Sequence, residues 1–392
     1  MSLSFIAERM CNIGTEAAFE VFAAAKELER RGVKVVHLEL GEPDFDTPQH
    51  IKDACAKSLR DGFTHYTPST GISELCEAIA EKIKADYGVD VNPRSQVVVM
   101  PGAKPCLYTA IVATVNPGDE VIIPNPTYPI YESVVRFIGG KPVPVPLKEE
   151  NDFRLNPDDV AKRITSQTRM IVLNSPNNPC GSMLSKKDVE GIAEIARERK
   201  LIVLSDEIYS KITYEEPHHS ILSEPGMLEQ AIMVDGFSKT YAMTGWRLGY
   251  AVANSEVISH MVKLQINITS CPVSFIQAAA VVALKATQEP SKAMVREYDR
   301  RRKVVVEGLN RIKGITCRMP TGAFYAFPNV KSFNMKSKEL MRYLLEKAGV
   351  ALVHGDAFGE YGEGYLRLSY ATSIENIKEG LQRMEESLGN LT

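Results

Sequence analysis

From about residue 95, the sequence alternates short runs rich in valine and isoleucine with longer helical patterns. This alternation is typical of strand–helix units, which build a mostly parallel β-sheet. Because the runs are apolar throughout, we expect the sheet to be covered by helices on both faces. The pattern therefore predicts an α/β fold with a large domain around one central sheet. The expected strands lie at residues 96–100, 121–124, 170–174, 201–205, 232–235 and 248–253.

A long charged helical pattern at residues 291–311 contains few helix breakers. At 1.5 Å per residue such a helix would be about 30 Å long, which suits a connector between two domains. Strand and helix patterns alternate again after it, as in a smaller α/β domain. We predict an N-terminal arm at 1–14, the N-terminal part of the small domain at 15–45, the large domain at 46–290, and the C-terminal small domain with the interdomain helix at 291–392.

The charge balance argues against one large class of partner. The 392 residues include 46 lysines and arginines against 49 aspartates and glutamates, a formal charge of −3. This balance does not provide the basic surface that binds phosphate backbones, so we expect no nucleic-acid partner. With 44% hydrophobic and 24% charged residues, the composition is that of a globular protein. An enzyme acting on small molecules is the leading interpretation.

Signals for membranes, secretion and metals do not appear in the sequence. The apolar run at 278–284 is far shorter than the roughly 18 residues of a membrane-spanning helix. Glu8 interrupts the region where a secretory signal would continue its apolar core, so we expect a cytoplasmic protein with no membrane partner. The seven cysteines form no C-x-x-C pair, which indicates reduced thiols, and we expect no metal site.

Two cations follow the expected strand at 232–235. Lys239 comes after this strand and before a glycine-bounded turn, at the sheet edge where open α/β sheets place their ligands. By itself Lys239 is either a solvated surface residue or a nucleophile. Arg247 supplies a second cation, whose planar fork suits a phosphate. Two cations near one sheet edge indicate an anionic ligand.

A carboxylate and an amide follow two neighbouring strands. Asp206 ends a buried run, where an unpaired carboxylate would be costly, so it either caps the next helix or has a cationic partner. If the site holds a pyridine ring, Asp206 keeps its nitrogen protonated, and Tyr209, one helical turn on, reaches the same ring. Asn178 lies in a loop rich in asparagine and proline. It either belongs to a simple turn or donates its amide to a ring oxygen or a carboxylate.

Three further positions are candidates for ligand binding. The glycine turn before Ala103 opens an apolar helix, and such a helix N-terminus is a ready anion site. This turn lacks the G-x-x-x-x-G-K-[ST] pattern of a P-loop. Arg367 alternates with leucines along a strand, so it faces either water or a carboxylate. Tyr128 either stacks on a planar ligand or fills the core.

Eight motifs occur in order along nearly the whole chain. They are LELGEPDFDTP, HYTPSTGISELCEAIA, PGAKPCLYTAI, NSPNNPCG, SDEIY, FSKTYAMTGWRLGY, GAFYAFP and YLRLSYA. In this order they resemble the fold-type I pyridoxal-phosphate aminotransferases of class I/II, in particular the prokaryotic aspartate aminotransferases. The resemblance implies the PLP-transferase fold of type I, transaminase activity, and pyridoxal 5'-phosphate as the cofactor.

The resemblance also implies roles at the cofactor. Lys239 would form the Schiff base and move a proton between substrate and cofactor, while Asp206 would hold the pyridinium. Tyr209 and Asn178 would bond the phenolic oxygen of the ring, and Tyr128 would stack on the ring. The phosphate would be held by the backbone amides of Ala103 and Lys104, by Ser238 and Arg247, and by Tyr66 from the neighbouring subunit.

The substrate site follows from the same resemblance. Arg367 would pair with the substrate α-carboxylate, assisted by the backbone of Gly41, with Tyr128 and Asn178 beside it. Because a neighbouring subunit contributes to the site, a homodimer acting on amino acids and 2-oxo acids is implied. Two positions depart from the family pattern, namely Cys180 in place of threonine, which we expect to change loop packing, and Gly236 in place of a phosphate-binding serine.

The amino donor depends on two residues with opposite effects. Lys104, in the first turn of its helix, opposes the helix dipole and so serves an anion; in relatives with a matching lysine it meets the side-chain carboxylate of aspartate or glutamate. Glu16, in the region that closes over the substrate side chain, would repel such a carboxylate. We predict transfer from aspartate to 2-oxoglutarate. The alternatives are an alanine or aromatic donor, a β-lyase on the same fold, and a non-catalytic regulator.

Overall fold

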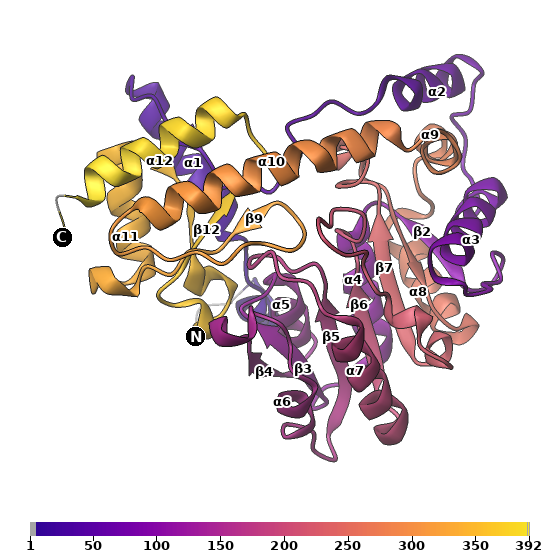
Figure 1. Ribbon diagram of the computed structural model, residues 1–392. Helices are drawn as coiled ribbons and strands as arrows, with labels where there is room; N and C mark the ends of the chain where they lie inside the picture. The colour runs from indigo at the N-terminus through magenta and orange to yellow at the C-terminus, as the bar shows by residue number, and fades with distance from the viewer. Residues whose placement is uncertain (1–4, 390, 392) are drawn as a thin grey trace.

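The computed structural model describes residues 5–389 and residue 391. Its centre is a seven-stranded sheet in the order β2-β8-β7-β6-β5-β3-β4 (Figure 1). Strands β3 to β7 run parallel to one another, whereas β8 is antiparallel to β2 and β7. The mostly parallel α/β sheet and the six expected strands are therefore confirmed. The strands are β2 (Val97–Met100), β3 (Glu120–Asn125), β4 (Lys141–Pro146), β5 (Thr168–Asn174), β6 (Ile202–Asp206), β7 (Ala231–Gly236) and β8 (Gly249–Val252).

Strand β4 was not expected from the apolar pattern. Its sequence is KPVPVP, and proline cannot donate a hydrogen bond to a neighbouring strand. The structure places β4 at the edge of the sheet, paired only with β3. An edge strand can carry prolines because one side of its backbone has no partner strand.

Alternate side chains of the strands enter two separate cores. Val98 and Met100 of β2 pack on one face, whereas Val97 and Val99 pack on the other. This two-sided burial explains why the strands read as continuous apolar runs. The first face is covered by α4 (Ala103–Thr114), α5 (Ile130–Phe137) and α8 (Ser255–Thr269). The opposite face is covered by α3 (Ser73–Tyr87), α7 (Lys186–Arg199) and α9 (Ser274–Lys285), with α2 (Gln49–Arg60) and α6 (Pro157–Ala161) outside them.

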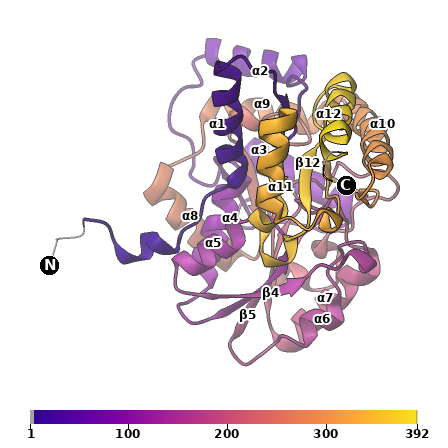
Figure 2. The same ribbon diagram turned by 90° about the vertical axis from the view of Figure 1, so that its left-hand side faces the viewer.

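A second group of elements packs around smaller sheets. Strands β11, β12 and β9 form an antiparallel sheet in that order, and β1 pairs in parallel with β10. Figure 2 shows α12 alongside α10 on one flank of this group. The elements are α1 (Ala17–Arg30), β1 (Val36–His37), α10 (Glu289–Arg311), β9 (Tyr325–Ala326), α11 (Ser337–Tyr343), β10 (Val350–Ala351), β11 (Val353–His354), β12 (Leu366–Ser369) and α12 (Ile374–Leu388).

Helix α10 links the two groups of elements. It runs from beside α9 to the small sheet, as Figure 1 shows in orange. The helix expected at 291–311 begins two residues earlier, at Glu289, because Pro290 occupies the first turn, where no backbone donor is needed. Tyr298, Val305 and Leu309 of α10 are buried in the core of the smaller group. No helix in the described part of the chain has an apolar stretch long enough to cross a membrane.

Candidate active site

A cavity of about 520 Å³ lies at the carboxyl ends of β6 and β7 and is bordered by β12. The structure brings eleven of the twelve predicted site residues to this one cavity. Tyr66 does not line it and is 89% exposed. The eleven are Gly41, Ala103, Lys104, Tyr128, Asn178, Asp206, Tyr209, Ser238, Lys239, Arg247 and Arg367.

Lys239 lies in the turn that follows β7. Its Nζ donates a hydrogen bond to the carbonyl of Gly41 at 2.6 Å. Burial lowers the pKa of Lys239 to about 8; nearby Glu42 acts against this shift, and the guanidinium groups of Arg367 and Arg247 add to it. A lysine with this pKa is about one-tenth neutral at pH 7, far more than an ordinary lysine. Lys239 lines the cavity and is partly buried, so the structure favours the nucleophile interpretation over the solvated one.

Asp206 is a buried carboxylate at the end of β6, with a side chain that meets two donors. The hydroxyl of Tyr131 donates to Oδ2 at 2.6 Å, and the backbone N–H of Ile208 donates to Oδ1 at 3.2 Å. Burial raises the pKa of Asp206 to about 6, although both hydrogen bonds oppose the rise. A cationic N–H placed in the cavity would stabilise the ionised form. The carboxylate therefore fits a protonated pyridine nitrogen.

The N-terminus of α4 and Arg247 form the anion-binding end of the cavity. Gly102 precedes the helix with φ of 111°, and a Cβ atom at this position would lie 2.6 Å from Nη2 of Arg247. The glycine thus lets the guanidinium approach the free N–H groups of the first turn of α4. Ser238 lines the same cavity. Helix N–H groups, a hydroxyl and a guanidinium together fit a phosphate group.

Arg367 on β12 is only 3% exposed, so it does not face water. Its Nη1 donates to Oδ1 of Asn178 at 3.3 Å, and its Nη2 donates to the carbonyl of Glu39. Within the described part of the chain, Nε of Arg367 has no hydrogen-bond partner. The guanidinium therefore keeps donors for a carboxylate. The contact also fixes the Asn178 amide, whose oxygen accepts from Arg367 while its NH₂ group is left to donate.

Glu16 lines the same cavity and contacts both Lys104 and Tyr128. Its carboxylate forms an ion pair with Lys104, and its Oε1 accepts a hydrogen bond from the hydroxyl of Tyr128 at 2.9 Å. The Lys104 side chain is 43% exposed and the Glu16 side chain 26%. The positive charge expected at Lys104 is thus already balanced by a residue of the same chain.

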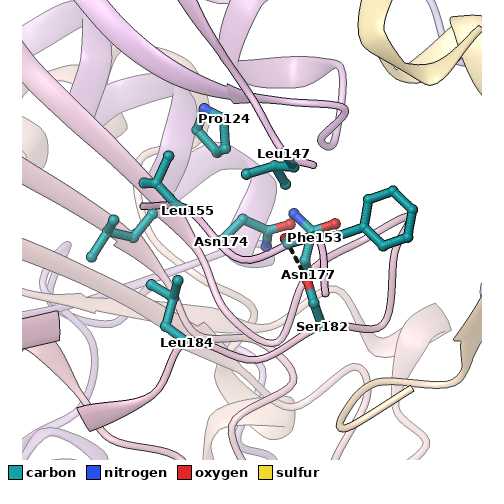
Figure 3. Close-up of a pocket in the computed structure, with 9 residues that line it drawn as sticks. Pro124, Leu147, Phe153, Leu155, Asn174, Asn177, Ser182 and Leu184 are labelled. Carbon is teal, nitrogen blue, oxygen red and sulfur yellow. Dashed lines mark hydrogen bonds between the residues drawn. The ribbon is translucent and has the colours of Figure 1, made fainter. Parts of the chain in front are cut away.

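The two positions that depart from the family pattern, Cys180 and Gly236, do not line the cavity. Cys180 is buried and does not line the cavity, and its N–H donates to Oδ1 of Asn177 at 3.0 Å. At Gly236 a Cβ atom would lie 3.0 Å from Cα of Gly249, so glycine suits the close approach of β7 and β8. Figure 3 shows a second, small cavity beside the loop that carries Asn178, where the Asn177 N–H donates to the Ser182 carbonyl at 2.8 Å. This cavity is lined mainly by apolar side chains.

Sequence reasoning missed two tyrosines at the site. The hydroxyl of Tyr131 donates a hydrogen bond to Asp206, and the hydroxyl of Tyr325 lies 2.7 Å from that of Tyr209. Both tyrosines lie in segments that drew attention, NPTYPIY and GAFYAFP, but no spacing rule connects either one to its partner.

Comparisons with known proteins agree with this geometry. A family model described as "Aminotransferase class I and II" matches residues 33–384. An aspartate aminotransferase of Pyrococcus abyssi is 47% identical over 373 residues, 94% of each chain. An aromatic-amino-acid aminotransferase 2 of Thermococcus litoralis is 44% identical over 90% of this chain and 92% of the relative. The solved structure of an alanine aminotransferase from Pyrococcus furiosus is 37% identical, with a TM-score of 0.92 over 98% of this chain and 100% of that chain.

The lowered pKa of Lys239 can be tested on the cofactor-free protein. Only the neutral amine reacts with an aldehyde, so the initial rate of combination with pyridoxal phosphate should rise with pH through a midpoint near 8. An ordinary lysine would have its midpoint near 10.5. The rate is followed by absorbance, and Lys239→Ala should abolish it. A midpoint near 10 in the unaltered protein would contradict the lowered pKa.

Proposed function

The chain belongs to the class I and II aminotransferases, which use pyridoxal phosphate, and we propose that it transfers the amino group of L-aspartate to 2-oxoglutarate. The observation that carries the proposal is the pair of cations in one cavity, Arg367 for the α-carboxylate and Lys104 for a second carboxylate. Aspartate and 2-oxoglutarate each carry two carboxylates, so each substrate can use both cations. The name of the Pyrococcus abyssi relative supports the same donor.

The bound pyridoxal phosphate supplies an electron sink for charge that develops at the substrate α-carbon, and it carries the amino group from donor to acceptor. Arg367 binds the α-carboxylate through two parallel N–H···O hydrogen bonds and so orients the α-carbon. The neutral amine of Lys239 would take the proton from the α-carbon and deliver it to C4′ of the cofactor, the carbon that receives the amino group. Asp206, ionised above its pKa of about 6, accepts the hydrogen bond of the ring N–H.

The remaining cofactor contacts are proposed from the same cavity. Tyr209 and the NH₂ group of Asn178 would donate to the phenolic oxygen of the ring, and Tyr128 would stack on the ring. The backbone N–H groups of the first turn of α4, the Ser238 hydroxyl and Arg247 would hold the phosphate. The cavity lining and the close approach of Gly102 to Arg247 support this assignment.

The position of Glu16 bears on whether the site accepts acidic or neutral substrate side chains. A substrate carboxylate competes with Glu16 for Lys104 and the Tyr128 hydroxyl, whereas a neutral side chain leaves that cluster intact. We propose that an acidic substrate displaces Glu16. The relatives are named for aspartate and for aromatic amino acids, and the structural neighbour for alanine, so the donor must be measured on this chain.

The proposed donor is tested by steady-state kinetics of the cofactor-loaded protein with 2-oxoglutarate as acceptor. We expect kcat/KM for aspartate to exceed that for alanine and for phenylalanine by about tenfold or more, equivalent to about 1.4 kcal/mol from the second ionic contact. Equal or higher values for alanine or phenylalanine would overturn the aspartate assignment. Pyruvate and ammonia formed without an acceptor would instead identify a β-lyase.

The competition at Lys104 is tested with Glu16→Gln. Removing the carboxylate frees Lys104 and removes a repulsive charge, so kcat/KM for aspartate should rise about tenfold, with the value for phenylalanine within about twofold of the original. Glu20→Gln, an exposed change one turn further along α1, is the matched control and should alter neither value. An unchanged or lower value for aspartate in Glu16→Gln would contradict the competition.

We infer a homodimer in which Tyr66 of the partner subunit reaches the phosphate site. Tyr66 is 89% exposed, and apolar side chains are also exposed at Phe5, Phe19 and Ile268, at 95%, 60% and 59%. A subunit contact would bury these side chains, and burial of apolar surface favours association. Sedimentation equilibrium should give twice the chain mass of 43.4 kDa, and a mass of one chain would contradict the dimer.

We also infer that the enzyme works in amino-acid metabolism in the cytoplasm. Its seven free cysteines support a reducing compartment. Fractionation of the source cells that recovers the protein in an oxidising compartment would contradict this location.

A further inference from the structure

Tyr325 lies between the two proposed halves of the active site. It is the first residue of β9, where it is paired with Ser369 of β12, two residues from Arg367. It lines the same cavity as Lys239 and is 1% exposed. We propose that Tyr325 is a positioning residue whose hydroxyl holds Tyr209 and whose ring holds Arg367, so that it joins the cofactor site to the substrate-carboxylate site. This inference rests on the roles proposed above for Tyr209 and Arg367.

The hydroxyl of Tyr325 has a defined partner. It lies 2.7 Å from the hydroxyl of Tyr209, and the two rings meet edge to face with centroids 5.7 Å apart. Tyr209 has one hydroxyl proton, so a Tyr209 that donates to the ring oxygen of the cofactor must accept from Tyr325. Tyr325 is then the first donor of a short chain of hydrogen bonds, and such chains strengthen each member in a buried site.

The Tyr325 hydroxyl approaches closely the backbone of Gly41, which contacts Lys239. A Cβ atom at Gly41 would lie 2.0 Å from that hydroxyl oxygen, so only glycine leaves room for it. The carbonyl of the same glycine accepts the hydrogen bond of Lys239. The hydroxyl of Tyr325 is thus packed against the backbone that holds the catalytic lysine.

The ring of Tyr325 has a separate contact. Cζ of Arg367 lies 4.8 Å from the centroid of this ring and 5.1 Å from that of Phe358. Two ring contacts stabilise a buried guanidinium that lacks a carboxylate partner in the described part of the chain, and they limit its rotation. The ring therefore acts on substrate binding, whereas the hydroxyl acts on the cofactor.

These two actions predict different defects for two variants of the cofactor-loaded protein. Tyr325→Phe keeps the ring and loses the hydroxyl, so Tyr209 becomes a weaker donor to the anionic form of the ring oxygen. The midpoint of the pH-dependent absorbance change of the bound cofactor should therefore rise by about 0.5–1 unit, with KM for the amino donor unchanged. Tyr325→Leu also removes the ring, and KM should rise about tenfold.

Tyr370→Phe is the matched control. Tyr370 is a fully buried tyrosine of the same core whose hydroxyl bonds that of Tyr214 at 3.0 Å, and it does not line the cavity. Its variant should change neither the midpoint nor KM, and thermal unfolding of each variant verifies that it is folded.

The inference is overturned if Tyr325→Phe leaves the absorbance midpoint unchanged or shifts it no more than Tyr370→Phe does. It is also overturned if Tyr325→Leu raises KM no more than Tyr325→Phe. The absorbance midpoint needs no turnover, so it reports on Tyr325 even if the unaltered protein fails to use aspartate. Failure of the proposed donor and failure of this inference are therefore distinguishable.

Discussion

The guanidinium of Arg367 is a buried cation, held by a carbonyl, an amide oxygen and two aromatic rings. A buried charge without an opposite charge is costly, and these neutral contacts compensate only in part. The cavity is therefore arranged to receive a carboxylate from outside the chain. In the proposed function this requirement orients the substrate, because the carboxylate at Arg367 would be attached directly to the carbon that reacts.

The anion site at the start of α4 imposes the second constraint. The close approach of Arg247 to Gly102 places positive charge beside the N-terminus of α4, and Arg367 adds a second positive charge to the lining of the cavity. Lys239 lies in the same cavity, and burial together with these two cations lowers its pKa to about 8. The charges proposed to bind the two anions thus also raise the neutral fraction of the Lys239 amine, which would link binding to reactivity.

The sequence was sufficient for features that depend on short-range order along the chain. Apolar runs located the strands of the sheet, and the ends of these runs located Asp206 and Lys239. The sequence did not predict contacts between residues that are far apart along the chain. The partner of Asp206 is Tyr131, 75 positions earlier, and the partner of Tyr209 is Tyr325, 116 positions later. Lys104 was expected to serve the side-chain carboxylate of a substrate, but its pairing with Glu16, 88 positions away, depends on how α1 packs against β10 and β11. The segment boundaries at 15–45, 46–290 and 291–392 stay a prediction.

The central claim, that one cavity binds an amino acid at Arg367 and exchanges its amino group through the cofactor at Lys239, is tested most directly by absorbance spectroscopy. The protein is loaded with pyridoxal phosphate, and its spectrum is recorded before and after aspartate is added, and again after 2-oxoglutarate is added. The structure predicts that aspartate converts the cofactor to its amine form and that 2-oxoglutarate restores the original spectrum. A spectrum that aspartate, alanine and phenylalanine all leave unchanged would contradict the claim.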